Sequence, residues 1–232
     1  MTTFPILTAT PSAIAGFLSI APKSDVRYYL SGVYVEPDTG MMIATDGQVL
    51  LAHRTKARVA DVAPFIIPRA LLENVAKIKC AQVRISIQTD AVARHRLVML
   101  ETGNGEGKGT SFEPDGRTFT FAEIDGCYPD WRRIVPRTVS GAATQLDPEK
   151  LLQAKEAMQA VCGEKRSRYW PVHVNPNGAD QAAMITCSRI HTFAIVMPWR
   201  TDGSDFALTL DRFDLVLPPA PPAEVPAVAQ AA

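Results

Sequence analysis

The sequence lacks the features that mark membrane, secreted or strongly charged proteins. No apolar run approaches the roughly 20 residues that a membrane helix needs, and the N-terminal stretch lacks the basic start of a secretory signal. The 24 Lys and Arg residues balance 24 Asp and Glu residues, so the formal net charge is zero. This balance argues against a surface that is basic throughout but leaves local basic patches open. We expect a cytoplasmic globular protein.

Cysteine is scarce and widely scattered, and no Cys-x-x-Cys spacing occurs. The four cysteines are Cys80, Cys127, Cys162 and Cys187. Such a pattern predicts free thiols in a reducing compartment, with two disulfides as the alternative.

Motifs for catalysis and metal binding are also missing. The four histidines lie far apart, without the spacing of a ligand set: His53, His95, His173 and His191. The loop GNGEGKGT (103–110) has the composition of a phosphate-binding loop. However, Thr102 stands where the first glycine is needed, and Gly109 stands where Ser or Thr should hold magnesium. No Gly-x-Ser-x-Gly elbow is present. The sequence therefore predicts a protein that is not an enzyme and needs no metal or cofactor.

A threefold repeat is the main positive feature. Alternating apolar residues, helical stripes and turn signals predict the order βαβββ three times, with a period of roughly 60 to 70 residues. The first repeat has a helix at 11–21 and strands at 4–10, 27–36, 41–45 and 48–54. The second has a helix at 69–78 and strands at 63–68, 82–89, 96–102 and 118–124. The third has a helix at 147–162 and strands at 143–146, 170–176, 182–187 and 193–198.

The helix of the third repeat carries the clearest signals. Asp147 can cap its N-terminus, and Pro148 suits its first turn. Its predicted buried stripe consists of Leu151, Leu152, Ala154, Met158 and Val161. Since an apolar helix face of this kind can be buried only against the sheet of its repeat, the sequence predicts an α+β fold.

The C-terminal residues depart from the repeat. FALTLDRFDLVL (206–217) predicts one more strand, although its Leu-x-Leu spacing leaves docking into a pocket as an alternative. The Pro/Ala-rich stretch 218–232 has too few large apolar residues to pack, which favours disorder.

Five motifs resemble the bacterial sliding clamp, the beta subunit of DNA polymerase III, in the order and spacing of that family's middle and last domains. They are DVRYYLSGV (25–33), ATDG (44–47), IIPR (66–69), YPDWRRIVP (128–136) and VMPWR (196–200). Each domain of that family is a doubled βαβββ unit, in agreement with the repeat. The resemblance implies a complete clamp-like domain at 1–136, a half domain at 137–203 and a tail at 204–232.

The resemblance also implies an assembly. The family closes rings from twelve such units, so three units per chain favour a homotetramer, with a monomer or dimer that closes no ring as the alternative. A clamp loader is a possible further partner.

A hydrophobic pocket for short partner peptides is implied by the same motifs. Its residues would be Leu30, Thr45, Gly47, Leu50, Pro129, Arg133, Ile134, Ile195, Val196, Met197, Pro198 and Trp199. Trp131 is expected to pack in the core beneath it. Two features depart from the family: Gln48-Val49 replaces a His-Arg pair, and Trp199 replaces a smaller residue. The alternative is that these segments are simply core strands.

Contacts to DNA are implied for a second set of residues: Arg27, Tyr28, Tyr29, Arg69, Lys77, Lys150 and Lys155. They would touch phosphates of double-stranded DNA without reading its sequence. The alternative for the basic residues on the helices is a solvated face of mixed charge, because glutamates are interspersed among them.

Two functional hypotheses follow. The first is a processivity factor, phage-like in its shortened form, that encircles DNA and tethers polymerases or repair proteins. The second is an adaptor or decoy that binds clamp-binding peptides without encircling DNA and so modulates host replication.

Overall fold

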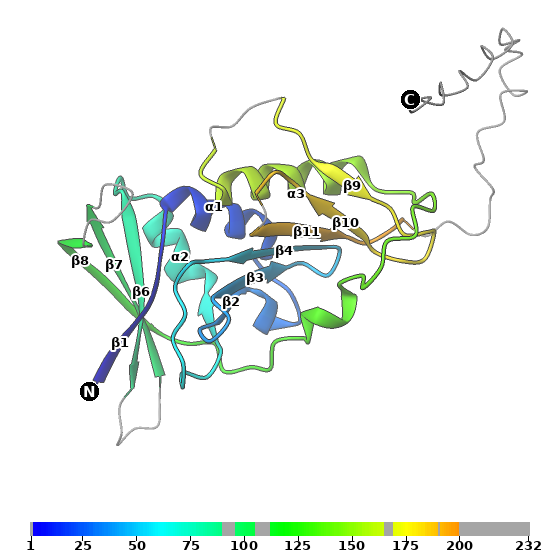
Figure 1. The fold of residues 1–232 in the computed structure, drawn as a ribbon. Coiled ribbons are helices and arrows are strands. Elements are labelled where there is room, and N and C mark those ends of the chain that lie inside the picture. The colour runs from blue at the N-terminus through cyan, green and yellow to red at the C-terminus, as the bar shows by residue number, and fades with distance from the viewer. Residues whose placement is uncertain (1, 90–95, 105–111, 165–168, 190, 200–232) are drawn as a thin grey trace, which may run out of the picture. The chain divides into compact units, whose positions relative to one another are not determined.

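Two antiparallel sheets and three α-helices make up the described part of the chain in a computed structural model (Figure 1). The structure describes residues 2–89, 96–104, 112–164, 169–189 and 191–199. These residues all belong to one compact unit, Met1–Arg200. The predictions for 206–217 and 218–232, and for most of the loop 103–110, lie outside the described residues. No helix in the described ranges is long and apolar enough to cross a membrane.

Each of the two sheets has its own strand order. The four-stranded sheet runs β1 (Thr2–Ala9), β6 (Gln82–Thr89), β7 (Arg96–Asn104) and β8 (Glu113–Ala122). The seven-stranded sheet runs β5 (Phe65–Pro68), β2 (Gly32–Glu36), β3 (Met41–Thr45), β4 (Val49–Arg54), β11 (Thr192–Val196), β10 (Ala183–Thr186) and β9 (His173–Asn175). The α+β class is confirmed.

The first two repeats exchange their first strands. β1 opens the first repeat but pairs with β6 of the second, and β5 opens the second repeat but pairs with β2 of the first. The expectation that each repeat forms its own sheet is therefore wrong. Sequence periodicity marks a strand and its faces, but the identity of its neighbour depends on the edge that the tertiary fold brings beside it.

The third repeat extends the sheet of the first. β4 pairs with β11 from Val49↔Val196 to His53↔Thr192, and the His53 Nδ1 and Thr192 Oγ1 atoms lie 2.8 Å apart across this junction. The predicted strand 143–146 does not form, because no neighbouring sheet edge is available to it among the described residues. The predicted strand 27–36 is also wrong in part: a 3₁₀ helix, Tyr28–Leu30, precedes β2.

The turn between β3 and β4 follows its sequence closely. Gly47 has φ of +94°, a left-handed value that favours glycine, and Asp46 Oδ1 accepts hydrogen bonds from the backbone N–H groups of Gln48 and Val49. Asp46 and Gly47 therefore form a tight hairpin turn between β3 and β4.

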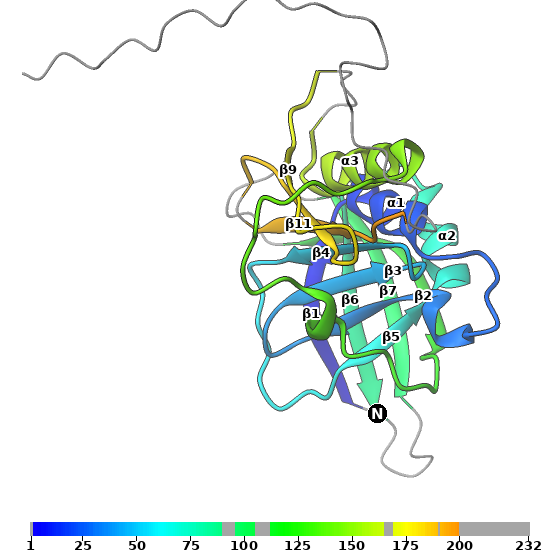
Figure 2. The same ribbon diagram turned by 90° about the vertical axis from the view of Figure 1, so that its right-hand side faces the viewer.

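The helices α1 (Pro11–Ile20), α2 (Arg69–Ala76) and α3 (Pro148–Val161) pack side by side, α1 between the other two (Figure 2). Thr10 and Asp147 cap α1 and α3 with their side chains. Gly16 lets α1 approach α3 closely, because a Cβ atom there would lie 2.8 Å from the Ala157 carbonyl oxygen. Leu152 departs from its predicted burial: its side chain is 51% exposed, on the far side of α3 from Ala157.

The central strands of the seven-stranded sheet are buried on both faces. Its inner face packs with the helices and the four-stranded sheet in one large core. Its outer face carries a smaller set of buried residues, here called the outer cluster: Leu30, Met41, Ile43, Leu50, Ala52, Ile66, Tyr128, Trp131, Ala182 and Ile195. The chain segment around residues 124–136 covers this outer face.

Candidate functional site

A short 3₁₀ helix, Trp131–Ile134, holds the covering segment on the outer face of the sheet. Asp130 caps it by accepting a hydrogen bond from the Arg132 backbone N–H. The Trp131 ring is 8% exposed and lies in the outer cluster, so its predicted core position is confirmed. Since the ring anchors the middle of the segment, the residues that follow it emerge at a defined place on the surface.

A buried carboxylate on β2 fixes this helix. Glu36 is 4% exposed and accepts hydrogen bonds from Trp131 Nε1 at 3.0 Å and from both terminal nitrogens of Arg132 at 2.7 and 2.5 Å. Thr39 Oγ1 donates to the same carboxylate at 2.9 Å. Burial raises the pKa of Glu36, but the hydrogen bonds from Arg132, Trp131 and Thr39 outweigh it and hold that pKa below its ordinary value.

A hollow of about 460 Å³ opens where the covering segment meets the third repeat, and we call it the junction hollow. Three of the predicted pocket residues line it: Arg133, Ile134 and Met197. The remaining lining comes from residues 132 and 135–138 and from the turn between β9 and β10, where Asn177, Asp180 and Gln181 add polar groups. Ala182 and Val135 connect its floor to the outer cluster. The lining is therefore mixed, with apolar side chains such as Ile134 and Met197 beside several charged and polar groups, and such a surface can bind a short peptide that carries both apolar and polar side chains.

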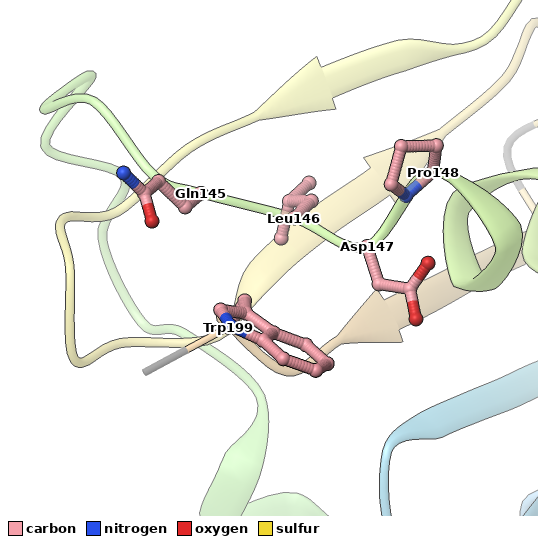
Figure 3. A pocket seen from close by; sticks show the side chains of 5 residues that line it. All are labelled: Gln145, Leu146, Asp147, Pro148 and Trp199. Atoms are coloured by element: carbon pink, nitrogen blue, oxygen red, sulfur yellow. The ribbon is translucent and has the colours of Figure 1, made fainter. Parts of the chain in front are cut away.

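A second hollow, of about 490 Å³, lies beside Trp199, and we call it the Trp199 hollow. Figure 3 shows its lining: Gln145, Leu146, Asp147, Pro148 and Trp199. The Trp199 indole is 58% exposed, while its backbone N–H donates to the Gln145 carbonyl oxygen at 2.8 Å. Trp199 thus belongs to a different hollow from Met197.

The other predicted pocket residues fall into two groups. Four have buried apolar side chains that cannot touch a ligand at the surface: Leu30, Leu50, Ile195 and Val196. The first three belong to the outer cluster beneath the covering segment, whereas Val196 points to the inner core. Thr45 is buried in the β3–β4 turn, where Gly47 N–H donates to its hydroxyl; Gly47 and Pro129 are exposed, and Pro198 is half-buried.

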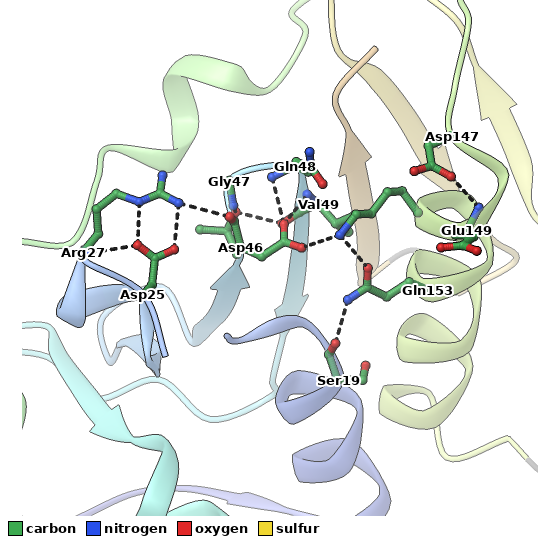
Figure 4. Close-up of polar contacts among 12 residues, drawn as sticks. Ser19, Asp25, Arg27, Asp46, Gly47, Gln48, Val49, Asp147, Glu149 and Gln153 are labelled. Atoms are coloured by element: carbon green, nitrogen blue, oxygen red, sulfur yellow. Dashed lines mark hydrogen bonds and ion pairs between the residues drawn. The ribbon is translucent and has the colours of Figure 1, made fainter. Parts of the chain in front are cut away.

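The residues predicted to contact DNA engage in internal contacts to differing extents. Figure 4 shows Arg27 bound to Asp25 and to the Asp46 carbonyl oxygen. Lys150 of α3 pairs with the Asp46 carboxylate at 2.9 Å. Gln153 extends this network by donating to the Ser19 carbonyl oxygen at 2.7 Å. Asp46 therefore connects the β3–β4 turn to the third repeat.

Arg69 is largely buried, with a side chain that is 13% exposed. Its guanidinium donates to the carbonyl oxygens of Leu18 and Ala21 and pairs with Glu73 at 2.7 Å, which joins α2 to the end of α1. Tyr28 is exposed, and its hydroxyl donates to the Asp125 carbonyl oxygen, while Tyr29 packs against the outer cluster. Lys77 is exposed at the end of α2, and Lys155 is half-buried on α3.

Sequence reasoning missed two parts of this site. Glu36 carries no motif, although a carboxylate at the end of an otherwise apolar strand is a signal for a buried ion pair. Part of the polar lining of the junction hollow comes from the turn 177–181, which reaches the hollow because β4 pairs with β11.

The comparisons with known proteins point to sliding clamps. No family model matches the chain. It is 29% identical over 147 residues to the beta sliding clamp of Vibrio cholerae, an alignment that covers 62% of this chain and 36% of that protein. The chain therefore spans about a third of the length of this curated relative.

Solved structures of sliding clamps are also similar to this chain. The Pseudomonas aeruginosa DNA polymerase sliding clamp matches with a TM-score of 0.55 at 18% identity, covering 84% of this chain and 66% of that one. The Helicobacter pylori beta clamp bound to a DNA ligase peptide matches with a TM-score of 0.53 at 13% identity, covering 85% of this chain and 65% of that one. The resemblance to the sliding-clamp family, and with it the clamp-like fold, is confirmed.

Proposed function

We propose that the chain is a sliding-clamp-like processivity factor that binds double-stranded DNA without sequence specificity and tethers polymerases or repair proteins by their short peptides. The observation that carries the proposal is the junction hollow, where Arg133, Ile134 and Met197 converge on a clamp-like fold. In this proposal, residues 1–136 act as a complete clamp domain and 137–203 as a half domain. The assembled form is a homotetrameric ring, as three repeats per chain imply.

Peptide binding should depend on Met197. Its thioether side chain lines the junction hollow and can adapt to an apolar partner. Removing it by Met197→Ala is expected to weaken binding of a fluorescein-labelled Leu/Phe-bearing clamp-binding peptide by roughly tenfold, since burial of such a side chain contributes about 1.5 kcal/mol or more. Fluorescence anisotropy measures the affinity.

Met184→Ala is the matched control, because Met184 packs against the outer cluster from β10 but does not line the hollow. Its effect on peptide affinity should be less than about twofold, within the scatter for residues outside a contact. Equal affinities for the Met197→Ala variant and the unaltered protein would refute the pocket.

DNA retention distinguishes a ring from a surface that merely binds phosphates. Protein concentrated together with a nicked circular plasmid, so that oligomers can assemble around the DNA, should remain with the circle in a gel-filtration column at moderate salt. Cutting the plasmid with a restriction enzyme should release it, because a ring slides off an end. Release from both forms, or retention on both, would count against encirclement.

The second candidate is the non-encircling adaptor. One observation favours it. Arg27, Arg69 and Lys150 form ion pairs with carboxylates of the same chain, so fewer cationic side chains remain to contact DNA phosphates. An adaptor would bind the peptide with the same dependence on Met197 but would show no difference between circular and linear DNA.

A further inference from the structure

Residues 143–146 lie where the third repeat should have its opening strand, although they form no β-ladder with another strand among the described residues. In the second repeat, the Ile124 N–H donates to the Ile66 carbonyl oxygen, three residues before α2 begins at Arg69. In the third repeat, the Trp199 N–H donates to the Gln145 carbonyl oxygen, three residues before α3 begins at Pro148. The two bonds join the end of the last strand of a repeat to the same place in its first segment. Segment 143–146 is thus held as β5 is held, but among the described residues no strand pairs with its other side, and its Thr144 hydroxyl bonds to the turn at Asn177 and Gly178.

The strand that should receive such a segment also has an open edge. β2 and β6 follow the helices of the first two repeats, and each takes the first strand of the other repeat on its outer edge. β9 is the equivalent strand of the third repeat, and within the described ranges it pairs with β10 alone. The third repeat therefore has both a donor segment and an acceptor edge, and the described residues contain no fourth repeat that could pair with them.

We propose that two copies of this chain dimerise by exchanging residues 143–146. The segment from each copy pairs antiparallel with β9 of the other, about a two-fold axis, so that two third repeats complete one domain like that of residues 1–136. A two-fold interface of this kind is self-complementary, which makes a second copy the partner that fits. The first two repeats of the chain already exchange their first strands with this antiparallel pairing.

The length of the β9 edge and the exposure of two apolar side chains agree with a second copy as the partner. Pro171 and Pro176 restrict the usable edge to residues 172–175, because proline cannot donate to a ladder, and four residues match the length of both 143–146 and β5. Val174 on β9 is 40% exposed. Within residues 1–136, α1 packs against α2. The equivalent contact in the proposed dimer would join two α3 helices. It would cover Leu152, which is exposed and lies about 140° around α3 from Ala157, the residue that faces α1.

Cross-linking between differently tagged copies tests the exchange. One copy carries Gln145→Cys and the other Val174→Cys, both with Cys127→Ser to remove the exposed native thiol. A short bis-maleimide should join the mixed pair in at least about fivefold higher yield than it joins either variant to itself. Each chain has only one introduced thiol, so the mixed product cannot arise within a chain. The size-matched control replaces Val174→Cys with Val26→Cys, which is fully exposed in a loop of the first repeat. A mixed yield equal to that control would overturn the proposal.

Mass in solution gives an independent measure that needs no variant. Light scattering at micromolar concentration should report at least twice the chain's 25.2 kDa. Four chains would support the exchange together with pairing at β8, the last strand of the second repeat, whose outer edge is unpaired in the described part of the chain. A strict monomer or a trimer would overturn it. Neither measurement uses DNA or peptide, so a dimer that fails to stay on circular DNA would keep the exchange and lose the processivity proposal.

Discussion

Replacing Trp131 with alanine should lower the free energy of unfolding by about 3–5 kcal/mol, the usual cost of removing a buried large aromatic side chain. The indole fills the centre of the outer cluster, stacks at a tilt on Phe193 of β11 with centroids 6.4 Å apart, and carries the Arg132 guanidinium over its face. Its loss leaves a cavity and also removes the Nε1 hydrogen bond to Glu36. Urea unfolding followed by far-UV circular dichroism measures the change.

Trp199→Ala supplies the matched control for this experiment. It removes the same side chain from a site where the indole is mostly exposed, and it keeps the backbone N–H that bonds to Gln145. The expected change is within about 0.5 kcal/mol. Trp131→Phe keeps an aromatic ring in the cluster but removes the hydrogen bond to Glu36 and part of the apolar volume, so we expect an intermediate loss of about 1–3 kcal/mol. If Trp131→Ala and Trp199→Ala cost the same, the covering segment does not depend on this ring.

Much of the fold could be predicted because local signals agree with it. The caps at Thr10 and Asp147, the turn at Asp46-Gly47 and the alternation of β6 each specify a local conformation by short-range contacts. Strand neighbours could not be predicted in this way. Whether β1 pairs with β2 or with β6 depends on which pairing buries the apolar faces of both sheets in one core. The alternation of apolar residues in β1 would be the same in either pairing. The failed strand at 143–146 has the same origin, since a strand requires a partner edge as well as a suitable sequence.

The candidate site shows the same limit. Motifs placed Arg133, Ile134 and Met197 near one another, and the junction hollow brings them together. The burial of Leu30 and Leu50 could not be derived from them, because both residues are covered by a segment about 80 to 100 positions later in the chain. The separation of Trp199 from Met197 could not be derived from strand alternation, because residues two positions apart in a strand share one face and both residues lie beyond the end of β11 at Val196.

Acidification should weaken the junction between the first and third repeats, through His53. This residue lies on β4, and its Nδ1 meets the Thr192 hydroxyl of β11, which in turn lies 3.5 Å from the Cys162 thiol of α3. Burial, with a smaller contribution from His191, lowers the pKa of His53 from 6.5 to about 4. A histidine whose folded pKa is depressed is held neutral by the fold. Its contribution to stability is therefore complete above pH 6.5 and is lost as the pH falls toward 4, because the unfolded chain takes up the proton first.

The expected loss between pH 7.5 and pH 5 is about 2 kcal/mol from this one group, by proton linkage over a shift from 6.5 to about 4. His53→Gln removes the titration while leaving a side chain that can still bond to Thr192. Urea unfolding at both pH values should show the variant losing about 2 kcal/mol less than the unaltered protein on acidification. Equal acid sensitivity of the His53→Gln variant and the unaltered protein would show that protonation of His53 does not control this junction. The predicted result would mean that protonating one imidazole is enough to loosen the strand pair that carries Met197 to the junction hollow.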